Sequence, residues 1–202
     1  MATTTNFTAK DVQELRQRTG AGMMDCKKAL TDSSGDMERA AELLRAKGAA
    51  KADKRAGRET REGYIGHYVH HNGKVGALVE VNCETDFVAR NADFRELVRE
   101  IAMQVASTAP LAVDRDGIPV DVVDRERRIA EQQVAESGKP EHIRGKIVEG
   151  KVDAFFKDNT LLSQPWIRDG KKTIADLVKE ASAKVGENIV VRRFARFEIG
   201  RE

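Results

Sequence analysis

The stretch Asn82-Cys83-Glu84-Thr85-Asp86-Phe87-Val88-Ala89-Arg90 connects the clearest strand pattern of the chain to one of its clearest helix patterns. Before it, residues 75–82 alternate, which predicts a strand with one apolar face: Val75, Ala77, Val79 and Val81. After it, Asn91 can cap a helix with an apolar stripe: Phe94, Leu97, Val98, Ile101 and Val105. Phe87 beside Asp86 in a short polar connection suggests a side chain offered to a partner. The alternative, which stays open here, is that Phe87 packs back onto its own sheet.

Two further segments complete a three-stranded antiparallel sheet. Tyr64–His70 and Val75–Asn82 flank His71-Asn72-Gly73-Lys74, and Asn-Gly is the strongest short signal of a hairpin. Residues 189–199 also alternate, so we expect a third strand with Ile189, Val191, Arg193, Ala195, Phe197 and Ile199 on one face and Val190, Arg192, Phe194 and Arg196 on the other. Interleaved Arg and Phe also occur in strands that stack RNA bases, but the glycines of that signature are absent. A solvated basic face is the favoured interpretation.

The N-terminal part predicts three short amphipathic helices that share one small core. Capping residues and glycines mark their ends: Thr8 with Asp11, Gly20-Ala21-Gly22, Gly35, Asp36 and Gly48. A dinucleotide-binding loop follows a strand and opens a helix, whereas a helix precedes Gly20-Ala21-Gly22, so we do not assign a phosphate site there. The turn instead positions Met23 and Met24, whose adaptable apolar side chains suit a core or an interface.

The fold class expected from these patterns is α+β, in three parts. Residues 1–48 form the three-helix module, residues 49–62 an alanine-rich basic linker, and residues 63–202 a core with a three-stranded antiparallel sheet and packed helices. Within the core, residues 121–137 predict a charged, peripheral helix, and the next helix starts at Pro140. Residues 161–166 form an irregular packed segment. Thr173 with Asp176 predicts the start of a last helix, which Gly186 ends.

The composition limits the classes of function. Lys and Arg number 35 and Asp and Glu 33, so the net charge of +2 gives no strong overall attraction to nucleic acid or anionic lipid. No apolar run approaches the ~20 residues of a membrane-spanning helix, and Met1–Asn6 lacks the features of a signal peptide. Cys26 and Cys83 are too few for a disulfide framework, so we expect a cytoplasmic protein.

The sequence argues against a catalytic or metal site. Cys83 is the one candidate nucleophile, but acids beside a thiol raise its pKa and suppress the reactive thiolate. His67, His70 and His71 look like metal ligands, yet their spacing on an extended chain sends neighbouring members of the set to opposite faces. We therefore expect an interaction protein with no catalytic residue, metal or cofactor, rather than an enzyme.

Two long motifs identify a family. Arg18-Thr19-Gly20-Ala21-Gly22-Met23-Met24-Asp25-Cys26-Lys27-Lys28-Ala29-Leu30 and the 82–90 stretch closely resemble the elongation factor Ts family of bacterial translation. The resemblance continues through Gly138-Lys139-Pro140-Glu141, Lys146–Gly150, Gln164-Pro165 and Val191–Glu198, and it covers nearly everything from Thr8 to Gly200.

The resemblance implies a guanine-nucleotide exchange factor that binds the GDP form of elongation factor Tu, with no direct contact to nucleic acid or membrane. It implies that the three-helix module is similar to a ubiquitin-associated domain and contacts the partner's nucleotide-binding domain. It also implies that Thr85, Asp86, Phe87 and Val88 disturb the partner's magnesium site, with Asp86 and Phe87 foremost. For the module, the implied contact residues are Arg16, Thr19, Gly20, Ala21, Gly22, Met23 and Met24.

Two departures from the family pattern matter. Longer members carry a second core subdomain and a helical coiled-coil insertion, and this chain is too short for both. A homodimer whose second copy replaces the missing subdomain is our hypothesis. Trp166 stands where members usually have Phe, which keeps an aromatic anchor.

Overall fold

The computed structural model describes residues 6–201, so Met1–Thr5 of the N-terminal stretch discussed above lie outside the described residues. Helices α1 (Ala9–Thr19), α2 (Met23–Asp32) and α3 (Met37–Asp53) form the N-terminal module. Both hydrogen bonds of the Thr8–Asp11 capping box are present, and Asp36 caps α3. The three helices share a small buried core of Val12, Leu15, Cys26, Ala29, Leu30, Ala40 and Leu44. The predicted three-helix module is confirmed.

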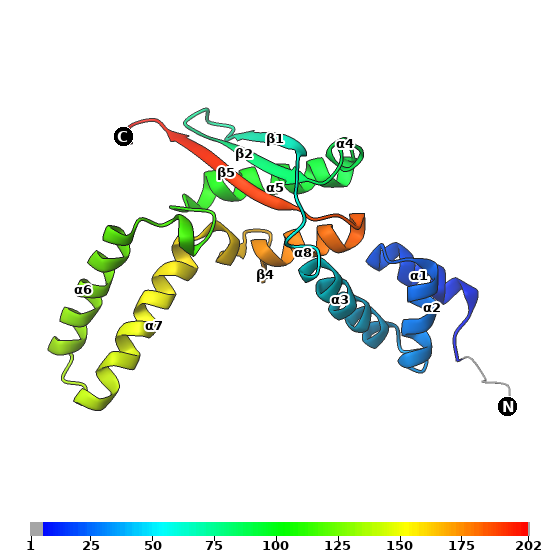
Figure 1. Cartoon of the computed structure of the whole chain (residues 1–202), viewed down its shortest axis with the longest axis horizontal. Helices are drawn as coiled ribbons and strands as arrows, with labels where there is room; N and C mark the ends of the chain where they lie inside the picture. The colour runs from blue at the N-terminus through cyan, green and yellow to red at the C-terminus, as the bar shows by residue number, and fades with distance from the viewer. Residues whose placement is uncertain (1–5, 202) are drawn as a thin grey trace.

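Helix α3 does not end at Gly48, as we expected, but continues to Asp53. The glycine has a different role, at a close approach of two helices: a Cβ on Gly48 would lie 3.0 Å from the Cβ of Ala183 in α8 (Ile174–Val185). Gly48 therefore serves packing between two helices and not helix termination. The start of the basic linker is helical, and α3 connects the module to the core (Figure 1).

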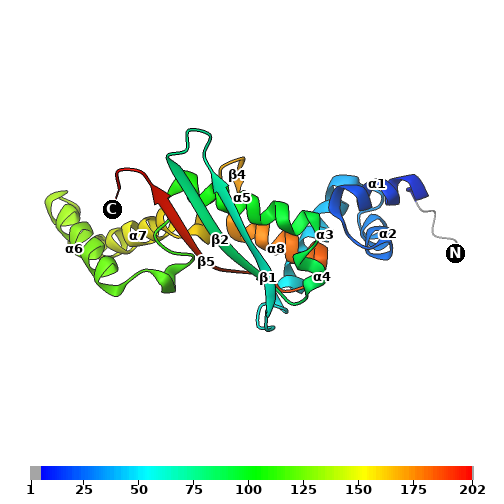
Figure 2. The same cartoon turned by 90° about the horizontal axis from the view of Figure 1, so that it is seen from above.

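The sheet has the strand order β1-β2-β5, with β1 (Glu62–Val69), β2 (Val75–Cys83) and β5 (Val190–Glu198) all antiparallel to their neighbours. The Asn-Gly hairpin is confirmed, since the His70 N–H donates to the Val75 carbonyl across the turn. The inner face of β2 is buried against α5 (Ala92–Thr108) through Ala77, Val79, Val81, Phe94, Val98, Ile101 and Val105. Helix α8 lies beyond α5, so the core has a sheet layer over helices (Figure 2).

The unbroken alternation predicted for the third strand is wrong, because β5 contains a bulge. Glu80 pairs with Arg193 and Val81 with Val191, so Arg192 is an extra residue and the alternation reverses there. Val191 and Phe194 consequently both pack against the core. The outer face of the sheet carries exposed apolar side chains from all three strands: Ile65, Val69, Leu78, Phe197 and Ile199.

Helices α6 (Val120–Glu136) and α7 (Glu141–Asn159) pack against each other and project from the core (Figure 1). They share a small apolar cluster of Ala130, Val134 and Val148, and Arg127 pairs with Glu149 across the gap. The peripheral helix over 121–137 is thus present. The helices of this projecting pair are 17 and 19 residues long and are joined by a turn at Gly138, while the absence of the longer members' insertion stays a prediction.

Four short elements complete the core: η1 (Arg115–Gly117), η2 (Leu161–Ser163), β3 (Pro165–Trp166) and β4 (Asp169–Thr173). Trp166 packs against the core cluster, and its Nε1–H donates to Glu100 at 3.3 Å. Both bonds of the Thr173–Asp176 capping box are present, and Gly186 ends α8 in the left-handed conformation. Within residues 6–201, no helix is long and apolar enough to cross a membrane.

Candidate functional site

The 82–90 stretch contains a one-turn helix, α4 (Asp86–Ala89), and is not only a connection. Val88 and Ala89 are buried in the main core, while the Phe87 side chain is 86% exposed. The alternative that Phe87 packs back onto its own sheet is therefore wrong. In residues 85–88 the Phe87 side chain therefore faces solvent, while the next two residues of the turn, Val88 and Ala89, are fixed in the core. We call residues 85–88, together with Glu84 before them, the tip.

An exposed ion pair decorates the tip. Asp86 Oδ2 lies 2.8 Å from the Arg90 guanidinium, one helical turn away, and both side chains are more than half exposed. Such a pair contributes little to stability in water. The Asp86 carboxylate is therefore free to exchange Arg90 for a cationic or N–H donor on another protein.

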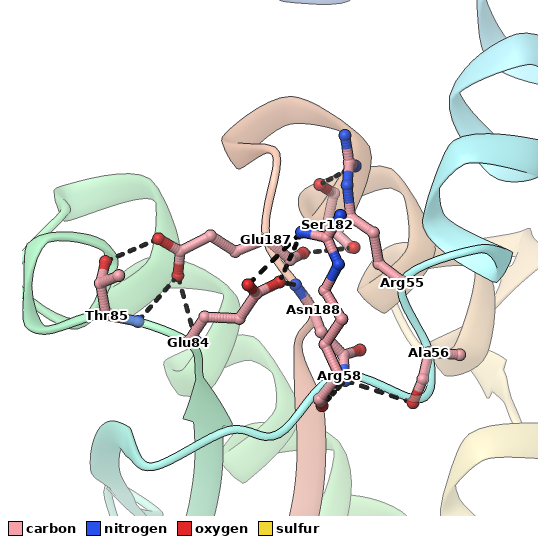
Figure 3. Close-up of polar contacts among 8 residues, drawn as sticks. All are labelled: Arg55, Ala56, Arg58, Glu84, Thr85, Ser182, Glu187 and Asn188. Atoms are coloured by element: carbon pink, nitrogen blue, oxygen red, sulfur yellow. Dashed lines mark hydrogen bonds and ion pairs between the residues drawn. The ribbon is translucent and has the colours of Figure 1, made fainter.

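Glu187 lies behind the tip and binds it through three hydrogen bonds (Figure 3). Its Oε2 accepts from the N–H groups of Glu84 and Thr85, both at 3.1 Å, and its Oε1 accepts from the Thr85 hydroxyl at 2.6 Å. The next residue, Asn188, donates its backbone N–H to Glu84 Oε1 at 2.6 Å. Sequence reasoning missed Glu187 and Asn188, which stand more than 100 residues away and follow an ordinary helix-ending glycine.

The same polar network reaches the linker between module and core. The Asn188 side chain is buried, and its amide donates to the carbonyls of Ala56 and Arg58 at 3.3 and 2.8 Å. Arg58 also approaches the Glu84 carboxylate at 3.5 Å (Figure 3). The tip, the linker and the turn between α8 and β5 are therefore connected through side chains far apart in the sequence.

Cys83 supports the tip through a hydrogen bond. It is fully buried, and its thiol donates to the Thr85 carbonyl at 3.2 Å. Burial raises the pKa of the Cys83 thiol to about 11, and the nearby Glu187 carboxylate contributes in the same direction. The expected direction is confirmed, although burial is the main cause and the contributing acids are Glu187 and Glu62 rather than Glu84 and Asp86. At neutral pH this thiol is protonated and a poor nucleophile.

The N-terminal turn joins α1 to α2 and brings the remaining sequence-derived candidates together: Arg16, Thr19, Gly20, Ala21, Gly22, Met23 and Met24. Gly20 has φ +67°, and its N–H donates to the Arg16 carbonyl at 2.8 Å. The Thr19 hydroxyl donates to the Leu15 carbonyl. Met23 and Met24 are both exposed, Met24 to 75%. These two methionines are surface groups, not core residues.

The end of α8 separates this turn from the helix that follows the tip. The side chain of Lys184 lies against Gly20, where a Cβ would come within 3.1 Å of its Cγ. The Lys184 ammonium pairs with Asp93 at 2.6 Å. Both candidate segments consequently lie on the same side of the molecule, where α4 and α1 neighbour the end of α8 (Figures 1 and 2).

The three histidines do not form one cluster. His67 lies on β1, whereas His70 is at the hairpin turn and its Nδ1 lies 3.0 Å from the Tyr68 hydroxyl. The expectation that His70 and His71 point to opposite faces is wrong: β1 ends at Val69, and in the turn the centroids of their two rings lie 4.2 Å apart. In the part of the chain that the structure describes, no group of three His, Cys, Asp or Glu side chains is placed to hold a metal ion.

Comparisons with known proteins agree with the motifs. The family profile described as Elongation factor TS matches residues 3–201. Elongation factor Ts of Fervidobacterium nodosum is 55% identical over 194 residues, which cover 96% of this chain and 98% of that protein. Elongation factor Ts of Syntrophobacter fumaroxidans is 53% identical over 199 residues, covering 98% and 100%. With its fold, its motifs and its full-length similarity in agreement, the chain belongs to the elongation factor Ts family.

Proposed function

We propose that this chain is a guanine-nucleotide exchange factor for elongation factor Tu, which binds the GDP form of its partner and speeds GDP release. The observation that carries the proposal is the tip: Phe87 is exposed while Val88 and Ala89 beside it are buried. An aromatic side chain on an anchored turn is suited to insertion into another protein, because little freedom remains to be lost on binding.

In the proposed mechanism, Asp86 and Phe87 disturb the partner's magnesium site, with Thr85 and Val88 as their frame. Mg²⁺ demands near-octahedral coordination, so a small shift of a supporting segment weakens its hold on the nucleotide phosphates. Phe87 acts as an apolar wedge that stabilises the shifted partner. Exchange is then a negative coupling between two sites: the factor weakens nucleotide binding, and the nucleotide weakens binding of the factor equally.

The magnitude of this effect requires a second contact. Burial of one Phe contributes ~1.5–3 kcal/mol, which is roughly one to two decades in affinity. A larger acceleration needs the N-terminal turn, where Met23 and Met24 offer adaptable apolar surface to the partner's nucleotide-binding domain. The module acts in this respect like a ubiquitin-associated domain.

The proposed activity needs no catalytic residue, metal or cofactor of this chain, since no covalent bond is made or broken. We place the protein in the cytoplasm, where its partner is a protein and not nucleic acid or membrane. The near-neutral net charge of +2 supports this choice of partner.

We also propose a homodimer in which the second copy covers the outer face of the sheet. Exposed apolar side chains from three strands lie on this face, with Phe197 67% exposed. The chain has one such sheet within residues 6–201, and a second copy supplies the same patch for a two-fold, self-complementary contact.

Release of a fluorescent GDP analogue from elongation factor Tu tests the exchange activity. We expect a release rate that rises with the concentration of this protein and saturates. Excess Mg²⁺ should reduce the stimulated rate, because it favours the nucleotide-bound partner. An intrinsic release rate that stays unchanged at saturating protein would refute the proposed function.

A further inference from the structure

We propose that Glu187 is a positioning residue for the tip: its carboxylate sets the orientation of the turn that presents Asp86 and Phe87. The inference rests on the proposed function, since it assigns a role in the same exchange reaction. Neither sequence motif nor resemblance pointed to Glu187. Its assignment comes from three hydrogen bonds to the tip (Figure 3).

The start of α4 lacks the usual side-chain cap. Thr85 occupies the N-cap position, where a threonine hydroxyl ordinarily accepts a hydrogen bond from an N–H in the first turn. Here Thr85 makes no side-chain cap bond and instead donates its hydroxyl to Glu187 Oε1 at 2.6 Å. A four-residue helix has almost no stability of its own. The start of α4 is therefore held by a residue from another part of the chain.

The negative charge of Glu187 strengthens its hold on the backbone at this point. Glu187 Oε2 accepts from two successive backbone N–H groups, those of Glu84 and Thr85, just where the α4 helix begins. Hydrogen bonds to a carboxylate are about twice as strong as those between neutral groups. A single side chain thus fixes the direction in which the chain leaves β2 and enters the tip.

Glu187 is itself held in place by its neighbours. The Ser182 hydroxyl donates to the Glu187 carbonyl at 2.5 Å, and Gly186 before it adopts φ +80°. Asn188 after it binds Glu84 through its backbone and the linker through its side chain. A group fixed on both sides can transmit position, whereas a freely rotating glutamate could not.

This anchor also lies near the second candidate contact. Lys184, one turn earlier in α8, lies against Gly20 of the N-terminal turn. The last turn of α8 and the residues after it therefore touch both segments that we propose to meet the partner. Glu187 positions only the tip, so the contact that we propose for the N-terminal turn remains when the Glu187 side chain is removed.

The test is stimulated GDP release by Glu187→Ala, measured over a range of factor concentrations. We expect the saturating rate to fall about tenfold, while the half-saturating concentration changes less than about threefold because the N-terminal contacts persist. Glu180→Ala, on α8 just before Glu187 and paired with Lys172, is the matched control and should match the wild-type rate. A wild-type saturating rate in Glu187→Ala overturns the inference.

A double-mutant cycle separates positioning from general stability. If Glu187 acts through the tip, Glu187→Ala should change the rate less than about twofold in a Phe87→Ala background. Full additivity overturns the inference. Hydrogen exchange should become at least about tenfold faster at the Glu84 and Thr85 amides and stay unchanged at Val79 and Val98 in the core. Unchanged exchange at the two tip amides also overturns it.

Two conservative variants guard against misfolding of Glu187→Ala. Glu187→Gln can still accept from both N–H groups and can donate to the Thr85 oxygen, although these bonds are no longer charge-assisted, so it should restore part of the rate lost in Glu187→Ala. Glu187→Asp keeps the charge but is one methylene shorter, so it should remain slow. The reverse order overturns the inference. If wild-type protein does not accelerate GDP release, the proposed function fails. The amide exchange of residues 84 and 85 then still tests whether Glu187 holds the tip in place.

Discussion

Lys184 and Asp93 form an ion pair at 2.6 Å that joins the last turn of α8 to the first turn of α5. Both side chains are about half exposed, so the pair itself contributes little stability. The aliphatic part of Lys184 does more, because it packs against Gly20 in the N-terminal turn. One side chain thereby links the N-terminal turn, which we propose to contact elongation factor Tu, to the helix that follows the tip.

The Phe87→Ala variant should slow stimulated GDP release by about ten- to a hundredfold, because the apolar wedge is lost. Its thermal unfolding should match wild type, since Phe87 is exposed. Val120→Ala, at another exposed apolar position on α6, is the control and should keep the wild-type rate. Equal release rates for Phe87→Ala and wild type would remove the wedge from the mechanism.

The Gly22→Val variant should bind elongation factor Tu about ten- to a hundredfold more weakly, because added methyl groups overpack the surface beside Met23 and Met24. The free chain has room for this side chain: Gly22 has φ −62°, and nothing lies within 4 Å of an added Cβ. Valine is a poorer N-cap than glycine, but this costs under about 1 kcal/mol. A titration that gives unaltered affinity would make the turn purely structural.

The Gly48→Leu variant should destabilise the protein by about 1–3 kcal/mol, because the added side chain forces α3 away from α8. A Cβ at this position already lies 3.0 Å from the Cβ of Ala183. Urea unfolding measures the loss. Ala183→Gly in the same chain should recover part of it by opening space, whereas Ala183→Gly alone should only destabilise. Equal losses in both backgrounds would place the strain elsewhere.

The buried Cys83 should make stability fall at alkaline pH. Its folded pKa is about 11, above the ordinary value of 9.0. The buried, protonated thiol contributes about 2–3 kcal/mol to the free energy of unfolding. This contribution is fully present below pH 9 and is lost as the pH rises to about 11, because the thiol of the unfolded chain ionises first. Urea unfolding from pH 7 to pH 11 should show this slope in wild type and a shallower one in Cys83→Ala. Parallel slopes would contradict the assignment, and exchange activity should survive the substitution.

Because we propose that a second copy covers the outer face of the sheet, the protein should be a dimer in solution. Light scattering should give twice the mass of one chain, and Phe197→Asp should give the single-chain mass, because a charge cannot be buried at the centre of an apolar contact. Val120→Asp on α6 is the control and should stay dimeric. A wild-type protein that is monomeric at working concentration would count heavily against the homodimer.

Local signals in the sequence were sufficient wherever structure depends on neighbouring residues. The Thr8–Asp11 and Thr173–Asp176 capping boxes and the Asn72-Gly73 turn all form as expected. Each involves residues at most three apart in capping, or a turn whose geometry its own residues favour. The position of the tip between a strand and a helix followed from the same periodicities.

The family, the α+β class and the candidate tip could all be predicted from the amino-acid sequence, since they depend on motifs and on periods of two and 3.6 residues. The exposure of Phe87 could not, because it depends on which neighbours occupy the space around the side chain once the chain has packed. Three further features also depend on the packed chain: the bulge at Arg192, the close approach of two helices at Gly48 and the hydrogen bond between Glu187 and Thr85. Each joins residues distant in sequence, and no local pattern encodes a distance between two segments until the chain has packed.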